Sequence, residues 1–428
     1  MQSSMTRVRW WVLTLLLLGT TFNYLDRIVL STLDLRIRES LHYDDVDYGY
    51  IFAAFQVAYG VGFLVVGKFV DRVGVRIGYG VSIACWSIAA AGHALANSAF
   101  SMGFWRALLG FGESGNFPSA IKAVAEWFPK KDRAFATGIF NAGTNIAVMI
   151  GPPILAYMYL HMGWRMCFLV PALFQFLLVV LWFATYHSPE KSKRANAAEL
   201  SYIRSDTSVE EISAPKVGWG TAIRMKQTWG FSIAKFFSDP VWWFYLTWLP
   251  SFLERSRGLS LKEVAWTLPV IYLMADFGSV AGGWLSGFLI RRGWPAGRAR
   301  KTALAVCACC MPIAAMSAFA PNYILTVALV SLATAAHQGW SANLFTTVSD
   351  VFPKGAVASV VGIGGAVGAV GNAIFSAIVA GVVVKYFGYA PMILLMGCFH
   401  LAGLAVLHLL MGDLKPVQIP SAKQASAG

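Results

Sequence analysis

Two ionisable side chains lie inside one long apolar stretch of the chain. Arg106 and Glu113 are seven residues apart in the run from Phe104 to Pro129. In a helix this spacing places both on nearly the same face, roughly 10 Å apart along the axis. An ionisable group near the centre of a membrane costs roughly 3 kcal/mol even on the mildest scale. The pair is therefore either an internal structural ion pair or part of a site that binds a charged ligand.

A second polar cluster falls in the first apolar stretch, which runs from about Trp10 to Ser31 and contains Asn23, Tyr24, Asp26 and Arg27. Counting residues from each end predicts that Arg27 and Arg106 lie at a similar depth. Tyr59, in the second apolar stretch, fits a packed aromatic as well as a ligand contact. The aromatic residues between Trp242 and Trp248 fit either an interface belt or rings that stack on a sugar.

The composition identifies the class of protein. The chain is 57% hydrophobic and only 13% charged, which is far too apolar for a soluble protein. Apolar segments of about 20 residues, each long enough to span a bilayer, recur along nearly the whole length. We predict an all-α membrane protein with twelve transmembrane helices. The first apolar stretch continues past any small-residue cleavage site, so we expect it to be retained as a span.

The net charge of +13 is distributed unevenly. Most Lys and Arg residues fall in loops on one side, starting with Arg7 and Arg9, which predicts that both termini are cytoplasmic. This placement argues against a nucleic-acid partner. The loop after the first span is acidic instead, with Asp34, Glu39, Asp44, Asp45 and Asp47.

Other functional classes find little support in the sequence. The cysteines fall inside apolar spans, and Cys307, Cys309 and Cys310 lack His or carboxylate neighbours at ligand spacing, so no metal site is expected. Neither HExxH nor GxSxG occurs within a span, which argues against an intramembrane enzyme. A substrate-sensing receptor would usually carry an added soluble signalling domain.

A polar stretch divides the chain into two parts. We predict an N-terminal six-helix bundle over residues 1–186, a flexible cytoplasmic linker over 187–228, a C-terminal six-helix bundle over 229–412 and a cytoplasmic tail over 413–428. An internal repeat with a period of 224 residues pairs Phe128-Pro129-Lys130 with Phe352-Pro353-Lys354. On this register Glu113 pairs with His337, so the two bundles are expected to be pseudo-symmetric.

The loop after the second span carries a recognisable motif. Gly67, Asp71, Arg72, Gly74 and Arg76 resemble the loop motif of the major facilitator superfamily, although Phe69 and Val75 depart from it. Taken alone, a charge run of this kind is usually a solvated loop. The resemblance implies the major facilitator fold, and a role for Gly67, Asp71, Arg72 and Arg76 in conformational switching.

Three further segments narrow the resemblance to the anion:cation symporter family: NYLDR from Asn23, FWRALLGFGESGNFP from Phe104 and EWFPKKDRAFATGIFNAG from Glu126. The segment AAHQGWSANLFTTVSDVFPK from Ala335 is most similar to hexuronate transporters. This resemblance implies a monomer in the bacterial inner membrane that imports sugar acids such as glucuronate and galacturonate with protons. It implies no cofactor beyond the proton gradient. An importer of aldonates, aldarates or aromatic acids is the alternative.

The resemblance also assigns residues. Arg27 and Arg106 match arginines that hold the substrate carboxylate, and Asp26 and Glu113 match protonatable acids. The resemblance also suggests sugar contacts at Tyr59, Asn145, Trp340 and Asn372. We predict that Tyr24, His337 and Gln338 are further substrate-binding residues. A planar guanidinium suits a carboxylate, which agrees with this assignment. We expect Arg106 to pair with ionised Glu113 in the empty protein, and the substrate to compete for that pair; a permanent salt bridge is the alternative.

Overall fold

The structure is a computed structural model that describes residues 5–205, 219–352 and 354–417. Every regular element in these ranges is a helix. Within them, nine helical segments are long and apolar enough to cross a membrane. The predicted spans outside this set are the fourth, which is divided into the shorter helices Ala99–Glu113 and Asn116–Trp127, and the seventh and tenth, which are helical. The fourth span carries Arg106 and Glu113, and the tenth carries His337.

The chain packs into two compact units. Unit 1 comprises Met1–Val209, Leu246–Pro269 and Ala377–Lys385, and unit 2 comprises Glu210–Tyr245, Val270–Ser376 and Tyr386–Gly428. This division differs from the predicted sequence halves because two segments of the second half pack within unit 1.

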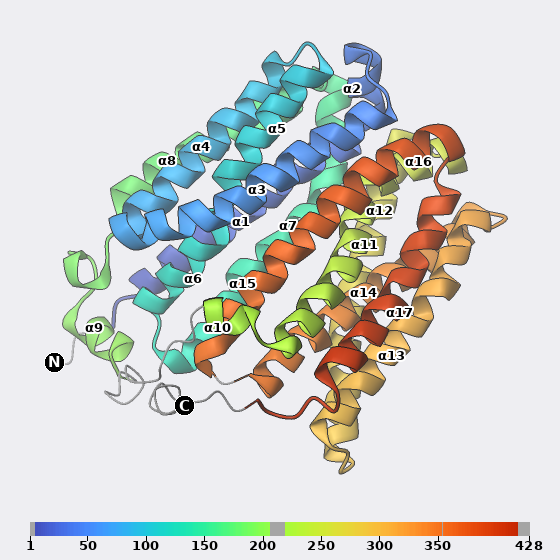
Figure 1. Ribbon diagram of the computed structural model, residues 1–428. Helices are drawn as coiled ribbons and strands as arrows, with labels where there is room; N and C mark the ends of the chain where they lie inside the picture. The colour runs from blue at the N-terminus through green and yellow to red at the C-terminus, as the bar shows by residue number, and fades with distance from the viewer. Residues whose placement is uncertain (1–4, 206–218, 353, 418–428) are drawn as a thin grey trace. The chain divides into compact units, whose positions relative to one another are not determined.

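Unit 1 is built from nine helices of the first half together with the ends of helices from the second. The nine are α1 (Val8–Thr32), α2 (Asp34–Leu41), α3 (Asp45–Val73), α4 (Val75–Gly92), α5 (Ala99–Glu113), α6 (Asn116–Trp127), α7 (Lys130–Met162), α8 (Met166–Thr185) and α9 (Ala197–Ile203). In Figure 1, α3 lies along α5, α1 along α7, and α4 along α5 and α8. A Cβ on Gly110 would lie 2.4 Å from the carbonyl oxygen of Phe55, so glycine is required where α5 crosses α3.

The turn between α3 and α4 contains the predicted switching motif. Gly74 has φ of +83°, a conformation that favours glycine. Arg76 donates from Nη2 to the carbonyl oxygen of Phe183 at 2.7 Å, which ties α4 to the end of α8. Arg72 is exposed, and the side chain of Asp71 lies outside the part that the structure describes. The switching role of Gly67, Asp71, Arg72 and Arg76 therefore stays a prediction.

Part of the predicted linker is folded against the start of α1. The carboxylate of Glu199, on α9, accepts from Thr6 Oγ1 at 2.6 Å and from the backbone N–H groups of Val8 and Arg9 at 3.1 Å each. It also accepts from Arg9 Nη1 at 3.2 Å. Glu199 is buried and satisfies N–H groups that the first turn of a helix leaves unpaired. The linker was predicted as flexible throughout, but α9 is an anchored helix; residues 206–218 lie outside the described residues.

Unit 2 contains most of the helices of the second half. These are α10 (Trp219–Ile223), α11 (Lys226–Arg257), α12 (Leu261–Arg291), α13 (Ala296–Ala315), α14 (Tyr323–Val351), α15 (Lys354–Gly371), a π-helical segment (Asn372–Val379), α16 (Ala380–Phe387) and α17 (Ala390–Met411), of which α11, α12, the π-helical segment and α16 extend into unit 1. Figure 1 shows α13 packed beside α14 and α17. The predicted tail begins in contact with this unit, because Val417 N donates to Val351 O at 2.8 Å.

Candidate functional site

A buried ion pair joins α1 to α5. Arg27 donates from Nε to Glu113 Oε2 at 2.6 Å, and the two side chains are 3% and 0% exposed. Glu113 is the last residue of α5. A negative charge at the C-terminus of a helix is unfavourable with respect to the helix dipole, so the guanidinium of Arg27 compensates both the burial and the position of this carboxylate.

Arg106 binds backbone atoms of α1. Its Nη1 donates to the carbonyl oxygen of Asp26 and its Nη2 to that of Arg27, each at 3.0 Å. The ion pair expected between Arg106 and Glu113 is therefore wrong for this conformation. Seven residues of helix separate the two Cα atoms by roughly 10 Å, and each side chain finds a nearer partner on α1.

Aromatic rings surround the guanidinium of Arg27. Its Cζ lies 4.6 Å from the ring centroid of Tyr24, 4.8 Å from that of Tyr59 and 5.4 Å from that of Phe55. Such contacts stabilise a cation away from water. The structure thus brings Tyr24 and Tyr59, both predicted as substrate-binding residues, into one cluster with Arg27 and Glu113.

Asp26 is held by a residue that the sequence analysis missed. Gln175, on α8, donates from Nε2 to both carboxylate oxygens of Asp26, at 2.9 Å each. Both side chains are buried. The signal available in the sequence was a single amide in an otherwise strongly apolar span. We call Asp26, Arg27, Arg106, Glu113 and Gln175 the buried cluster.

Several polar atoms in or beside the buried cluster have no hydrogen-bond partner among the described residues: Oε1 of Glu113, Oε1 of Gln175, Nε of Arg106 and both amide atoms of Asn23. An unpaired buried polar atom costs about 1–3 kcal/mol, and such atoms in native structures call for an explanation. A bound ligand that carries its own hydrogen-bonding groups would pair with these atoms.

A second polar group forms within unit 2. His337 Nδ1 lies 3.2 Å from His400 Nε2, and the ring of Trp242 stacks on His337 with centroids 5.6 Å apart. Trp340 packs against His400 at 5.2 Å. Two of the predicted sugar contacts, His337 and Trp340, therefore share a buried site with His400, which was not predicted.

Asn372 begins the π-helical segment of unit 2. With its amide oriented to suit its neighbours, it accepts from Trp243 Nε1 at 2.9 Å and donates to the carbonyl oxygen of Asp239 at 3.2 Å. The carboxylate of Asp239 pairs with Lys235 at 2.7 Å, and the sequence analysis did not anticipate this ion pair. Short π-helical segments occur frequently at functional sites.

The structure shows little about the two remaining predicted substrate contacts, Asn145 and Gln338. Asn145, on α7, accepts from Thr144 Oγ1 at 3.2 Å, and Gln338 is half-buried beside His337 on α14. Their roles stay predictions. Among the described residues, no group of three or more His, Cys, Asp and Glu side chains is placed to hold a metal ion.

The family model described as Major Facilitator Superfamily matches residues 16–376. The chain belongs to this superfamily. It is therefore a membrane transporter rather than an enzyme, and the predicted fold class is confirmed, because the superfamily fold has twelve membrane-spanning helices.

Curated relatives of similar length transport sugar acids. The hexuronate transporter of Escherichia coli K12 is 29% identical over 416 residues, covering 96% of both chains. The galacturonate transporter of Dickeya chrysanthemi is 31% identical over 280 residues, covering 65% of this chain and 81% of its own. A probable galactarate/D-glucarate transporter of Bacillus subtilis is 30% identical over 438 residues, covering 98% of this chain and 95% of its own. The resemblance noted from the sequence is confirmed.

A solved structure has the same fold. The crystal structure of a bacterial homologue of the human lysosomal transporter Spinster, in an inward-facing and occupied conformation, superposes with a TM-score of 0.69. The two chains are 18% identical, and the match covers 96% of each. At this identity the likeness concerns the fold alone.

Proposed function

We propose that this transporter imports sugar acids, above all hexuronates such as glucuronate and galacturonate, together with protons by alternating access. The observation that carries the proposal is the buried ion pair between Arg27 and Glu113. An anion and a proton compete for the two partners of such a pair, so the binding of one favours the binding of the other.

The proposed order of steps starts from the ion pair between Arg27 and Glu113 that the structure shows. The substrate carboxylate binds the guanidinium groups of Arg27 and Arg106, and Glu113 loses its cationic partner. A buried carboxylate without a partner is strongly unfavourable, so Glu113 takes up a proton. Its Oε1 has no partner among the described residues and can accept the proton without breaking a hydrogen bond. The proton and the sugar acid then cross together.

The other predicted residues fit subsidiary roles. Asp26 is proposed as a second protonatable group, held by Gln175. Tyr24 and Tyr59 line the guanidinium of Arg27 and are proposed to contact the sugar. The further proposed sugar contacts, in α7 and in unit 2, are Asn145, His337, Gln338, Trp340 and Asn372. A site for a sugar acid combines a cation with amide groups and an aromatic ring.

The alternative substrates are aldarates and aldonates. The relatives also support this alternative, because they include a probable galactarate/D-glucarate transporter and a D-galactonate transporter beside the hexuronate and galacturonate transporters. Uptake of labelled galacturonate into proteoliposomes, with and without an inward proton gradient, tests the proposal. We expect gradient-driven accumulation that unlabelled glucuronate inhibits more strongly than galactarate or galactonate. Stronger inhibition by galactarate would favour the alternative, and uptake indifferent to the gradient would exclude proton coupling.

We also propose a bacterial inner-membrane location, with both termini and the linker in the cytoplasm. The distribution of Lys and Arg supports this orientation. Cysteine introduced at Ser192 should be protected from an impermeant thiol reagent added outside intact cells, and labelling there would overturn the orientation.

Asp71 is proposed to act in conformational switching. Asp71→Asn is therefore expected to slow transport with little change in substrate affinity.

A further inference from the structure

Three polar side chains share one face of α6, and the proposed mechanism uses none of them. Ser119 follows Asn116 by three residues and Glu126 follows Ser119 by seven, and both intervals return to nearly the same face of a helix. Asn116 and Ser119 are fully buried, and Glu126 is half-buried. α5 ends at Glu113, so this face begins one turn from the carboxylate that is proposed to carry the coupled proton.

Asn116 connects this face to two other helices of unit 1. Its Nδ2 donates to Thr20 Oγ1, on α1, at 3.3 Å, and its Oδ1 accepts from the hydroxyl of Tyr79, on α4, at 2.9 Å. A Cβ built on Gly19 would lie 2.1 Å from that hydroxyl oxygen, so the absence of a side chain at position 19 leaves room for it. Thr20, Tyr79 and Asn116 are all fully buried. They form a short hydrogen-bonded chain inside unit 1.

Asn23 lies level with Glu113. α1 and the fourth span run in opposite directions, since later residues of the fourth span contact earlier residues of α1. Asn23 follows Thr20 by three residues and Glu113 precedes Asn116 by three, so each lies about 4.5 Å along its helix from the contact of Thr20 with Asn116, in the same direction. Both amide atoms of Asn23 and Oε1 of Glu113 are buried without a hydrogen-bond partner among the described residues.

Ser119 continues the series of unpaired atoms toward the end of α6. Its Oγ is also buried and has no partner in the part of the chain that the structure describes. Ordered water commonly pairs with buried polar atoms that lack a protein partner. These side chains are therefore suited to hold a file of water molecules. We call this set the polar track: Thr20, Asn23, Tyr79, Asn116, Ser119 and Glu126.

The polar track ends on the cytoplasmic side in the proposed orientation. Glu126 Oε2 accepts from the neutral hydroxyl of Tyr186 at 2.7 Å. Two residues further on, Phe128 packs edge-on against Trp10, with ring centroids 5.7 Å apart. The end of α6 therefore lies beside the first turn of α1, the turn to which α9 is anchored. Glu126 thus places a carboxylate where it can exchange a proton with water at the inner end.

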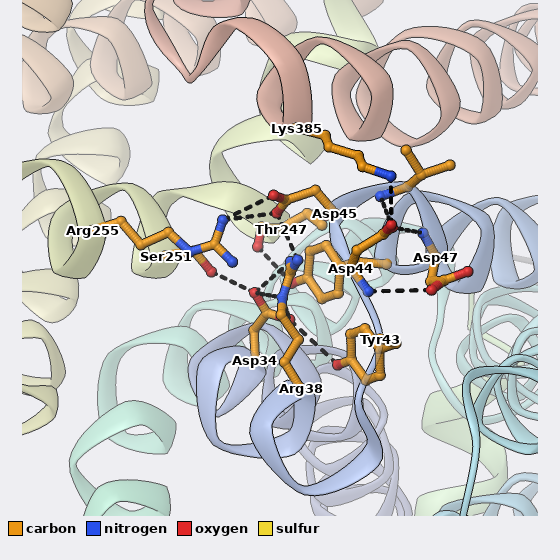
Figure 2. Close-up of polar contacts among 12 residues, drawn as sticks. Asp34, Arg38, Tyr43, Asp44, Asp45, Asp47, Thr247, Ser251, Arg255 and Lys385 are labelled. Carbon is orange, nitrogen blue, oxygen red and sulfur yellow. Dashed lines mark hydrogen bonds and ion pairs between the residues drawn. The ribbon is translucent and has the colours of Figure 1, made fainter.

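The end of unit 1 opposite α9, where Figure 1 shows α2, is built differently. Asp34 accepts three hydrogen bonds from the guanidinium of Arg38, at 2.8–3.1 Å (Figure 2). Asp45 pairs with Arg38 Nη1 at 2.6 Å and with Arg255 Nη1 at 2.9 Å. We call the four acids and four bases that pair here, together with one serine, the acidic network: Asp34, Arg36, Arg38, Asp44, Asp45, Ser251, Glu254, Arg255 and Lys385.

The two ends of unit 1 therefore offer a proton different partners. Each carboxylate of the acidic network already binds a cation, with which a proton would have to compete. Glu126 accepts instead from a neutral hydroxyl, and the unpaired atoms of Asn23 and Ser119 lie between it and Glu113. Ionisable groups within membrane spans commonly mark proton relays.

We propose that the coupled proton leaves Glu113 for the cytoplasm along the polar track, inside unit 1 and apart from the route of the sugar acid. After the substrate has left Arg27, the O–H bond of Glu113 breaks and the proton passes through water held by the track. The carboxylate of Glu126 takes up the proton and releases it to the cytoplasm, while ionised Glu113 pairs with Arg27 again. The inference rests on the proposed proton symport. Purely structural packing of these polar groups is the competing explanation.

Two variants test the path by separating proton release from substrate movement. Tyr79→Phe removes the hydroxyl that holds Asn116, and Asn23→Leu removes both unpaired amide atoms. Galacturonate uptake driven by a proton gradient and counterflow exchange are measured in the same proteoliposomes. We expect each variant to slow gradient-driven uptake about tenfold, because the proton leaves more slowly. Exchange should keep the parental rate, since it needs no net release of a proton.

Tyr48→Phe is the matched control. Tyr48 is as fully buried as Tyr79, and its hydroxyl donates to Thr247 O at the same distance of 2.9 Å, but it lies beside the acidic network. This variant should leave the ratio of the two rates unchanged. Equal slowing of uptake and exchange in the track variants would establish a structural role, and parental uptake in both would also overturn the path. A parent protein that ignores the gradient would contradict the proposed function, and the track would then rest on the next measurement.

That measurement needs no substrate. Hydroxyl radicals generated by X-rays from bound water oxidise the side chains beside that water, and mass spectrometry maps the modified residues. Tyr79 and Tyr48 are both 0% exposed, so bulk solvent reaches neither. We expect Tyr79 to be oxidised and Tyr48 to be protected, and Asn23→Leu to lower the oxidation of Tyr79. Equal protection of the two tyrosines would show that the track holds no water and would overturn the proposal.

Discussion

The buried cluster and the acidic network both consist of acids paired with arginines, yet they differ in how completely their polar atoms are used. In the buried cluster, Glu113, Gln175 and Arg106 each retain an atom without a partner among the described residues. In the acidic network, each of the four carboxylates binds at least one cation. An incomplete set of partners suits a site that receives a guest. A complete set suits two surfaces that must hold one another.

The two regions also differ in the parts of the chain that they connect. The buried cluster joins α1, α5 and α8, all from the first half of the sequence. The acidic network joins α2 and α3 to helices of the second half. We therefore expect substitutions in the buried cluster to change binding and coupling, and substitutions in the acidic network to change stability.

The largest expected effect comes from the arginines of the buried cluster. Arg27→Lys and Arg106→Lys keep the positive charge but lose the planar guanidinium that matches a carboxylate. Each should weaken galacturonate binding by about 10- to 100-fold, which corresponds to about 1.4–2.8 kcal/mol. Binding is measured by isothermal titration calorimetry on detergent-solubilised protein. Arg194→Lys, in the exposed linker, serves as the control. Near-normal affinity for galacturonate in both variants would show that the buried cluster does not bind the substrate carboxylate.

The next effect concerns coupling. Glu113→Gln imitates the protonated carboxyl group and should abolish accumulation driven by a proton gradient. The variant should still bind substrate and exchange it across the membrane, because exchange needs no net proton movement. Counterflow in preloaded proteoliposomes measures exchange directly. Accumulation at the parental level would make Glu113 a purely structural partner of Arg27.

Gln175→Leu should have a moderate effect. It removes both hydrogen bonds to the buried carboxylate of Asp26. Loss of such partners costs about 1–3 kcal/mol, so the maximal rate of uptake should fall by about tenfold. Gln175→Asn retains the amide and should be less affected. A variant whose rate and affinity match the parent would show that Asp26 needs no support from α8.

The smallest effect is the pH dependence of the acidic network. The bond from Lys385 lowers the pKa of Asp44, so this acid stabilises the network above its ordinary pKa, and the contribution is lost as the pH falls through the lowered value. Burial raises the pKa of Glu254, against the opposing effect of Arg36. Protonated Glu254 therefore stabilises the network, and this contribution is lost as the pH rises through the raised value.

The network should consequently contribute most to stability at mildly acidic pH. Thermal unfolding of the purified protein is measured across the pH range. Glu254→Gln should reduce the loss of stability at higher pH, and Asp44→Asn the loss at lower pH. The charged groups that face Glu254 are Arg36, Asp34 and Arg255, and they are unchanged in both variants. A pH profile that neither variant changes would show that the acidic network does not respond to protons.

The sequence predicted the helical fold and the acids and arginines of the buried cluster, because charged groups in apolar spans are conspicuous in the sequence alone. It predicted the wrong partner for Glu113, since spacing along one helix says nothing about the neighbouring helix that carries Arg27. Gln175 and His400 escaped notice because a single polar residue in a span becomes informative only when its contacts are known. The acidic loop after α1 was noted from its charge alone. Its partners lie more than 200 residues away in the sequence, for example Ser251 with Asp34, and only the structure brings them together.

The anchoring of α9 by Glu199 has a mechanical consequence. Residues 187–228 resemble one long tether in the sequence, but Glu199, in the first turn of α9, fixes this helix to the start of α1, and α10 begins at Trp219. The stretch of sequence between the anchored α9 and α10 is therefore shorter than the predicted linker. A shorter tether raises the effective concentration of the attached parts of the chain for one another.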